Sequence, residues 1–421
     1  MSTKSLVIRV PPPSATSDTH THDGEQNAWF RTQVLRLGSY ISRGWLNTIQ
    51  TLDVTYDNTC NYDEGSTIDM TPFASMARHL SSWPIFLEEM YIGLRLCNLG
   101  GAVDFIRTCT TLKVLVLDGK SLYPPEAHTE TDLSSLGYLP YTLTDLFVEN
   151  VHVRRDGLRE LTRLREQLKV LSLDNVNVID DDGEGNVVGI DVGFLSGMCK
   201  LEELHIVECP ICDEEAFASA ARGMVSLKEM KLDDTLLFKI HVSSSVHCPY
   251  LEKLTWKDSC LDAKTVARLT SLTELHMRRT EFYDTGDVDA QTSLRFLTRL
   301  TDLRVLNLDE VLDRYPLDVS PLVVLTRLEE VTIRHIDSCR GLFPLSHLVC
   351  LQTLDLQFHF RRPHIFYDGS CLTSLTNLTY LRVGGSKARF LEEDVELFRG
   401  LPDIEELDVY DVHGLQVCES V

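Results

Sequence analysis

Four residues near the middle of the chain have the types and spacing of a zinc site. Cys209 and Cys212 form a CxxC motif, and Cys199 and His205 closely precede it. Thiolate and imidazole groups are the ligands that zinc prefers, and four of them complete a tetrahedral site. However, Cys209 falls at a buried offset of the repeat pattern of this chain, and His205 falls on the opposite, outward side of its strand. We therefore predict a structural role for these residues and no metal.

The acidic run from Asp180 to Asp191 is similar to a calcium-binding loop. Counted from Asp180, carboxylates stand at positions 1, 3, 5 and 12, and Gly185 at position 6 allows the sharp turn. Two features differ from that pattern. Position 12 is an aspartate rather than a bidentate glutamate, and a strand-like segment precedes the loop where a helix is expected. We interpret the run as a solvated hairpin insert, with calcium binding as the alternative.

The sequence carries none of the common catalytic motifs. There is no nucleophile elbow, phosphate-binding glycine loop, HExxH motif or kinase signature, and His, Asp and Ser are scattered along the chain. We predict that the protein is not an enzyme and that it holds no cofactor.

The elements that position these side chains are set by a repeat. The phrases LRVLNLDEV and LEEVTIRHI, which begin at Leu303 and Leu328, place apolar residues at the same offsets, 1, 4, 6 and 9. Weaker copies begin near Ile49 and Leu87. Clear copies lie 21 to 33 residues apart and begin at Leu112, Leu143, Leu168, Leu201, Leu227, Leu251, Leu272, Leu303, Leu328, Leu351, Leu378 and Ile404. This spacing is typical of leucine-rich repeats.

The repeat predicts the fold. In each LxxLxL phrase, alternate side chains point inward and the intervening residues face out. Before each phrase, apolar residues recur at every third position, as in Val266, Leu269 and Leu272, which indicates a short helical turn. We predict an α/β fold: a leucine-rich repeat solenoid (horseshoe), with parallel β-strands on the concave face and short α or 3-10 helices or turns on the convex face.

Two local features resemble known varieties of this repeat class. Many leucine-rich repeats carry Asn at offset 9, whereas here small hydroxyl, thiol or β-branched residues occupy it. Cys209 and the ICDEEAFASAARGM phrase after it resemble the cysteine-containing repeats of F-box-type adaptors. The phrases LTSLTEL and LTNLTYL resemble leucine-rich repeat proteins of kinetoplastid protozoa. The resemblance covers about Leu87 to Val412 and implies the repeat fold rather than one function.

The chain is expected to have three parts. Residues 1–26 are rich in Pro, Ser, Thr and His, and predict a disordered tail. Residues 27–86 predict a capping helix, with apolar residues at helical spacing from Trp29 to Trp45, followed by a degenerate first repeat. Residues 87–421 predict the solenoid.

The composition of the chain indicates which kind of partner and which cellular compartment to expect. The net charge of −23 disfavours a nucleic acid backbone and favours a basic partner. No apolar run is long enough to span a membrane, and the N-terminal apolar segment is too short for a secretory signal. The 12 cysteines show no paired spacing, which favours a reducing, cytoplasmic location, with the nucleus as an alternative.

Stacked strands align equal offsets as columns on the concave face. The offset-7 and offset-8 columns are acidic over the earlier repeats and are interrupted by basic residues at Lys257, Arg278, Arg279, Arg334 and His335. From these columns we predict a partner-binding surface made of Asp118, Glu149, Asp174, Glu208, Asp233, Asp234, Asp258, Arg278, Arg279, Asp309, Arg334, Tyr380 and Tyr410.

The leading hypothesis is a non-catalytic scaffold that binds a protein partner through the concave face. One alternative is a substrate-recognition adaptor of an enzyme complex such as a ubiquitin ligase, although residues 1–86 contain no recognisable docking segment. An RNA-associated repeat protein is a further alternative, which the net charge disfavours.

Overall fold

The computed structural model of the 421-residue chain forms two compact units, Met1–Leu227 (unit 1) and Lys228–Val421 (unit 2). The repeat pattern predicted one solenoid over residues 87–421, and the division between the units lies within that range. The structure describes residues 5–10, 19–42, 49–56, 72, 75, 86–93, 100–119, 133–154, 156–179, 187–235, 248–258, 260–283, 294–310, 318–336, 342–358, 365–366, 369–384, 388–389, 397–412 and 415–420.

Unit 1 is built on a ladder of parallel strands in the order β1–β2–β3–β4–β5–β6–β8. A short antiparallel strand, β7, pairs with β6. Its strands are β1 (Ser5–Val10), β2 (Thr51–Tyr56), β3 (Glu89–Gly93), β4 (Val114–Asp118), β5 (Asp145–Arg154), β6 (Val170–Ile179), β7 (Val187–Val188) and β8 (Glu203–Val207). Its helices are α1 (Thr19–Ser42), α3 (Gly100–Ile106) and α4 (Glu214–Gly223), and its 3-10 helices are η1 (Ser134–Tyr138), η2 (Gly157–Leu164) and η3 (Val192–Leu195).

Unit 2 repeats this arrangement in the order β9–β10–β12–β14–β15–β16–β18–β20, with β21 antiparallel to β20. These strands are β9 (Glu229–Asp233), β10 (Lys253–Lys257), β12 (Glu274–Arg278), β14 (Val305–Asp309), β15 (Glu330–Ile336), β16 (Thr353–Phe358), β18 (Tyr380–Gly384), β20 (Glu406–Val412) and β21 (Leu415–Ser420). The other elements are β11 (Cys260–Asp262), α5 (Ala263–Val266), β13 (Glu281–Tyr283), η5 (Leu294–Arg299), η6 (Ser320–Val324), η7 (Phe343–His347), β17 (Ile365–Phe366), η8 (Gly369–Ser374) and β19 (Ala388–Arg389).

The leucine phrases place the strands as predicted. A strand begins two residues after every clear repeat start, so that Leu112 precedes β4 and Leu303 precedes β14 in the same register. The first leucine of each phrase is fully buried at every start except Ile404, which is half-buried. Alternating burial follows along the strands, because successive side chains point to opposite faces.

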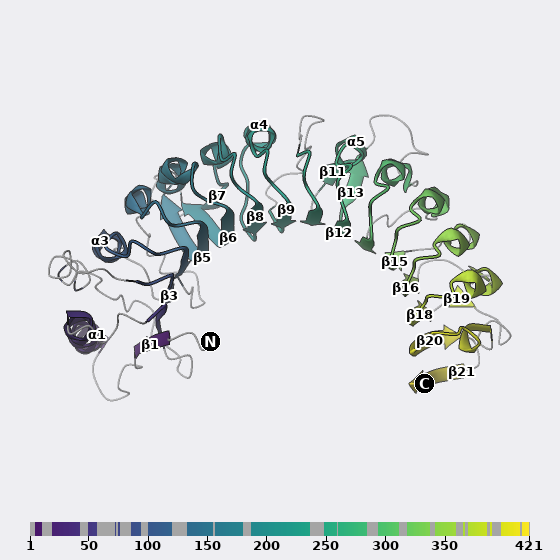
Figure 1. The fold of residues 1–421 in the computed structure, drawn as a ribbon, viewed down its shortest axis with the longest axis horizontal. Coiled ribbons are helices and arrows are strands. Elements are labelled where there is room, and N and C mark those ends of the chain that lie inside the picture. Colours follow the sequence, from purple (N-terminus) through teal and green to yellow (C-terminus); the bar gives the residue numbers. More distant parts are fainter. Residues whose placement is uncertain are drawn as a thin grey trace. The chain divides into compact units, whose positions relative to one another are not determined.

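The return segments cover one side of each ladder. Within each unit the strands line one side of the curve and the short helices lie on the other (Figure 1). Many of these segments are 3-10 helices with an apolar residue at every third position, as in Leu158, Leu161 and Leu164 of η2, all of which are buried. Because a 3-10 helix has three residues per turn, this spacing keeps one stripe against the core.

The N-terminal residues differ from the predicted disordered tail. Residues 5–10 form β1, which pairs in parallel register with β2, and α1 begins at Thr19 rather than near residue 27. The sequence SLVIRV contains three β-branched residues, which favour a strand, and Ile8 is buried. The predicted capping residues Phe30, Val34 and Leu37 are buried along one face of α1. Among the described helices, none combines the length and the apolar character that a membrane crossing requires.

Candidate protein-interaction surface

Outward-facing side chains form rows across the strands. We call the side of each ladder that is turned away from the helical segments the open face. On the open face of unit 1, Tyr91 of β3 pairs with Val116 of β4, which pairs with Phe147 of β5. All three side chains are half-buried. Adjacent strands lie about 4.8 Å apart, so these residues form a continuous apolar row.

An acidic row runs beside this apolar row. Asp118, Glu149 and Asp174 occupy paired positions on β4, β5 and β6, two residues further along each strand. The pKa of the Glu149 carboxyl is raised by burial and by the charges of Asp118 and Asp174 on either side. Like charges on adjacent strands are unfavourable. The structure thus brings together three of the predicted partner-binding residues and holds them at a cost in electrostatic energy.

The apolar row and two residues of the acidic row, Asp118 and Glu149, line a groove. Its volume is about 620 Å³, and its floor is made by the apolar row together with Val114 and Val170. Asp118 and Glu149 stand on one side, and a second pair of carboxylates, Asp145 and Glu203, also lines it. The pKa of Asp145 is raised, mainly by burial. An apolar floor between carboxylates suits a ligand that combines positive charge with apolar surface.

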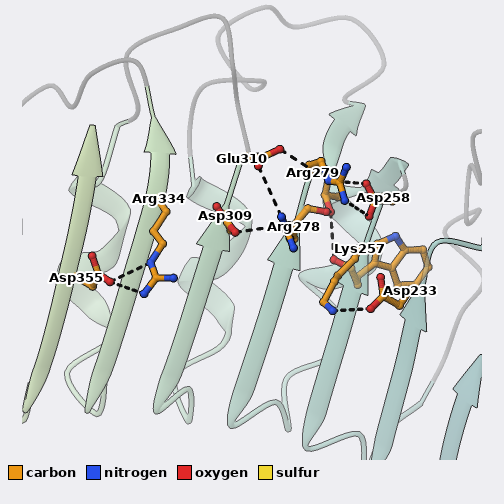
Figure 2. Close-up of polar contacts among 11 residues, drawn as sticks. Asp233, Lys257, Asp258, Arg278, Arg279, Asp309, Glu310, Arg334 and Asp355 are labelled. Atoms are coloured by element: carbon orange, nitrogen blue, oxygen red, sulfur yellow. Dashed lines mark hydrogen bonds and ion pairs between the residues drawn. The ribbon is translucent and has the colours of Figure 1, made fainter. Parts of the chain in front are cut away.

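The open face of unit 2 is different, because its charges pair with each other. Lys257 Nζ lies 2.5 Å from Asp233 Oδ2, and Arg279 Nε lies 2.8 Å from Asp258 Oδ1 (Figure 2). Arg278 Nε lies 3.4 Å from Asp309 Oδ2. These pairs join neighbouring strands or the turns that follow them, so the predicted basic interruption of the acidic face is neutralised by its acidic neighbours.

The same ladder of ion pairs continues towards the C-terminus. Arg334 donates from Nε and Nη2 to Asp355 Oδ2 at 2.9 and 2.6 Å, and Arg382 Nε lies 3.1 Å from Asp408 Oδ2. Asp355 is only 2% exposed. Arg334, which is one of the predicted site residues, is therefore also the ion-pair partner of a buried carboxylate.

The offset-8 residues of the predicted surface lie on turns rather than on strand faces. Glu208 and Asp234 directly follow β8 and β9 and have positive φ angles of 50° and 46°. Glu310, an offset-8 residue outside the predicted surface, follows β14 with a φ of 51°. Asp258 and Arg279 have the same left-handed conformation, with φ of 53° and 45°. These five residues lie at the edge where the strands end, and the role of Glu208, Asp234, Asp258 and Arg279 in partner binding stays a prediction.

Two asparagines at this offset were absent from the predicted surface. Asn150 donates to Asp118 Oδ1 at 2.9 Å, and Asn175 donates to Asn150 Oδ1 at 3.0 Å. They form a short relay along the edge of the acidic row. The sequence analysis considered Asn at offset 9, where it is absent. Asn at offset 8 in two consecutive repeats is the sequence feature that would have predicted these hydrogen bonds.

The remaining predicted residues lie apart from the groove. Tyr380 is half-buried on β18 of unit 2, and its pKa is raised by burial and by Asp355. Tyr410 lies in β20, but its side chain is outside the described residues. Tyr91, which the sequence analysis missed, lies in the weak repeat that begins at Leu87, at the same outward offset as Phe147.

Within the cysteine motif, Cys209 has the structural role predicted for it. Cys209 is fully buried, and its Sγ accepts a hydrogen bond from the Val176 N–H at 3.2 Å and donates to the Val207 carbonyl at 3.0 Å. Thr280 replaces it in unit 2, donating from its hydroxyl to backbone carbonyls. Of the calcium-like run, residues 180–186 are outside the described residues, and Asp191 accepts a hydrogen bond from the Gly193 N–H at the start of η3.

Three solved structures illustrate what this chain is similar to in fold. An internalin, InlF, from Listeria monocytogenes is 18% identical over 80% of this chain and 84% of its own, with a TM-score of 0.54. A leucine-rich repeat protein of Leptospira interrogans is 16% identical over 88% and 86%, with a TM-score of 0.50. TLR13, solved in complex with the RNA ssRNA13, is 16% identical over 89% of this chain and 56% of its own, with a TM-score of 0.52.

No family model matches the sequence, and no curated protein matches it. At these identities the likeness is one of fold. Together with the strand ladders and the buried leucine phrases, it shows that the chain has the leucine-rich repeat fold.

Proposed function

We propose that this chain is a non-catalytic interaction scaffold that binds a basic protein partner through the open face of unit 1. The observation that carries the proposal is the in-register row Asp118, Glu149 and Asp174 beside an apolar groove. Each carboxylate has a like charge on the adjacent strand. A basic partner would reduce this electrostatic repulsion on binding, and this reduction would favour the complex over the free protein.

The apolar part of the surface supports a macromolecular partner. Tyr91 and Phe147 offer aromatic area that is half-buried in the free chain. Large aromatic side chains at the centre of a contact contribute most to binding, because they are fully desolvated there. Charges around such a centre speed the encounter and exclude partners of the wrong sign.

The open face of unit 2 is the weaker candidate, for a physical reason. Its arginines and lysine already hold carboxylates at 2.5 to 3.4 Å, as in the pairs of Lys257, Arg278 and Arg279. A partner would have to separate these pairs, or bind over a surface whose charges largely cancel.

An adaptor subunit of an enzyme complex, such as a ubiquitin ligase, remains the alternative. It would use the same face for its substrate, and co-purification of a ligase core would distinguish it. The acidic row disfavours a phosphate backbone as ligand. The buried thiols of Cys109 and Cys209 support a reducing, cytoplasmic location.

A charge-reversal comparison tests the proposal. The face variant carries Asp118→Lys, Glu149→Lys and Asp174→Lys. A matched control carries Asp104→Lys, Asp156→Lys and Glu215→Lys, which are exposed positions outside the strands of unit 1 and change the net charge equally. Cell proteins captured by the wild-type chain and by the control, but lost by the face variant, are expected to be basic. If all three baits capture the same proteins, the open face of unit 1 is not the binding surface.

A further inference from the structure

We propose that the groove of unit 1 binds the side chain of an arginine, presented by an extended segment of the partner. This inference rests on the proposed function and specifies what the open face recognises. It begins from the shape and composition of the groove, which is an apolar floor flanked by carboxylates on both sides.

The floor selects the type of side chain. Tyr91, Val116 and Phe147 lie in paired positions on three consecutive strands, with their side chains half-exposed. Such a strip would cover the aliphatic stem of a long side chain, and it has aromatic rings at both ends. A guanidinium group stacks on aromatic faces and is weakly hydrated, whereas an ammonium group is compact and holds its water tightly.

The walls select the charge. Asp118 and Glu149 line one side, and Asp145 and Glu203 also line the groove. The carboxylates of Asp118 and Glu149 stand on paired positions of adjacent strands, so a planar group with several N–H donors can bond to both. A neutral or anionic occupant would leave these carboxylates repelling one another in a partly desolvated site.

The neighbours of Glu149 concentrate negative charge on one side of the groove. Asp118 accepts a hydrogen bond from Asn150, which fixes its orientation and leaves its negative charge in place. The charges that act on Glu149 are those of Asp118 and Asp174, both of the same sign. In unit 2, by contrast, Arg278 and Lys257 occupy the corresponding row and supply the cations from within the chain.

The test uses a synthetic peptide with a single arginine between two leucines, together with its lysine and citrulline versions. Citrulline has nearly the shape of arginine without its charge. Binding to the full chain is measured by calorimetry. We expect the arginine peptide to bind about 3- to 30-fold more tightly than the lysine peptide, and the citrulline peptide to bind most weakly. Equal binding of arginine and citrulline would overturn the inference.

Variants locate the binding in the groove. Phe147→Leu keeps the apolar area and removes the aromatic ring, so it is expected to abolish the preference for arginine over lysine. Tyr91→Phe keeps the ring and is expected to retain the preference. Asn307→Ala, on the open face of unit 2, is the control and is expected to bind as the wild type does. Circular dichroism establishes that each variant is folded. If Phe147→Leu retains the full preference for arginine over lysine, the aromatic ring in the groove does not recognise the guanidinium group.

Spermine addresses a different occupant, a small aliphatic polyamine. If spermine competes as strongly as the arginine peptide in the Phe147→Leu variant and in the wild type alike, the site recognises positive charge alone and the inference fails.

The arginine site and the proposed function can fail separately. If the triple charge-reversal variant loses a basic partner but the peptides do not bind in the groove, the scaffold function stands and the arginine site is ruled out. If the arginine peptide binds in the groove but the triple variant captures the same cell proteins as the wild type, the arginine site stands and the proposed binding face is ruled out.

Discussion

Arg334 donates two hydrogen bonds, from Nε and Nη2, to a single oxygen of Asp355, on the neighbouring strand and 21 residues later in the sequence. The carboxylate is 2% exposed, whereas the guanidinium that covers it is 38% exposed. Arg382 occupies the position opposite Asp355 in the register of β16 and β18. A buried charge is stable only while its partner is present, so this contact is expected to matter more than the exposed ion pairs of the chain.

Arg334→Ala is expected to lower the free energy of unfolding by about 3 kcal/mol, because it leaves the buried Asp355 carboxylate without its main partner. Chemical denaturation measures the effect. Arg304→Ala is the control: its partner, Glu329, lies 3.3 Å away, and both side chains are exposed, so a loss of less than about 1 kcal/mol is expected. Similar losses in the two variants would show that burial of Asp355 does not decide the outcome.

Glu149→Gln is expected to raise the melting temperature at neutral pH. The pKa of Glu149 is raised in the folded chain above its ordinary value of 4.5 by burial, Asp118 and Asp174. The folded protein therefore holds this proton more tightly than the unfolded chain does. It follows that the charged carboxylate destabilises the fold above the folded-state pKa, and that the penalty disappears as the pH falls through it.

The difference between Glu149→Gln and wild type is thus expected to be largest near pH 7 and to vanish below about pH 4.5. Thermal melts across this range measure it, with Glu215→Gln, an exposed helix position, as the control. A stabilisation that is the same at every pH would indicate better packing rather than relief of charge repulsion.

The buried thiols are expected to resist alkylation. Burial raises the pKa of Cys109 and of Cys209 to about 12, so almost no thiolate forms at pH 8. Among the described cysteines, Cys212 and Cys350 are exposed and are expected to react first with iodoacetamide. Mass spectrometry of peptides from the folded protein should find Cys212 and Cys350 modified and the two buried cysteines modified only after unfolding. Early labelling of Cys209 in the folded chain would contradict its placement between coils.

Cys209→Val is expected to destabilise the chain by about 1 to 3 kcal/mol, because valine leaves the Val176 N–H without the sulfur acceptor that it has at 3.2 Å. Cys209→Ser offers a hydroxyl that can both accept and donate, and should lose less. Chemical denaturation distinguishes them. A valine variant that is as stable as the serine variant would show that the sulfur contributes only by filling space.

Glu208→Val is expected to destabilise the chain by about 1 to 2 kcal/mol, whereas Glu208→Asn is expected to be neutral or stabilising. Glu208 has a φ of 50°, and a β-branched residue is strongly disfavoured there, while asparagine tolerates it. Glu330→Val, at the exposed first position of β15, provides the control for a strand site. If valine is tolerated equally at both positions, the turn relaxes to another conformation.

Most of the fold could be predicted because the leucine pattern is local. Leu303, Leu306 and Leu308 are all buried, as their offsets predicted, and β14 begins at the expected residue. The weak repeats carried less information: the Leu87 repeat yielded no candidate residue, although Tyr91 lines the groove. Residues 5–10 were expected to be disordered because they lie in a polar, proline-containing segment, yet they add a strand to the edge of the ladder.

The sequence by itself determined the period, the buried leucines and the sign of the charges, because each depends on residues within one repeat. Only the tertiary structure decided which charges meet. Asp118, Glu149 and Asp174 are separated by 31 and 25 residues, and they become a row because parallel strands stack in register. The same stacking places Arg334 beside Asp355, while Glu208 and Asp234 adopt left-handed conformations directly after their strands. Register and turn conformation follow from the packing of neighbouring coils, which no single repeat encodes.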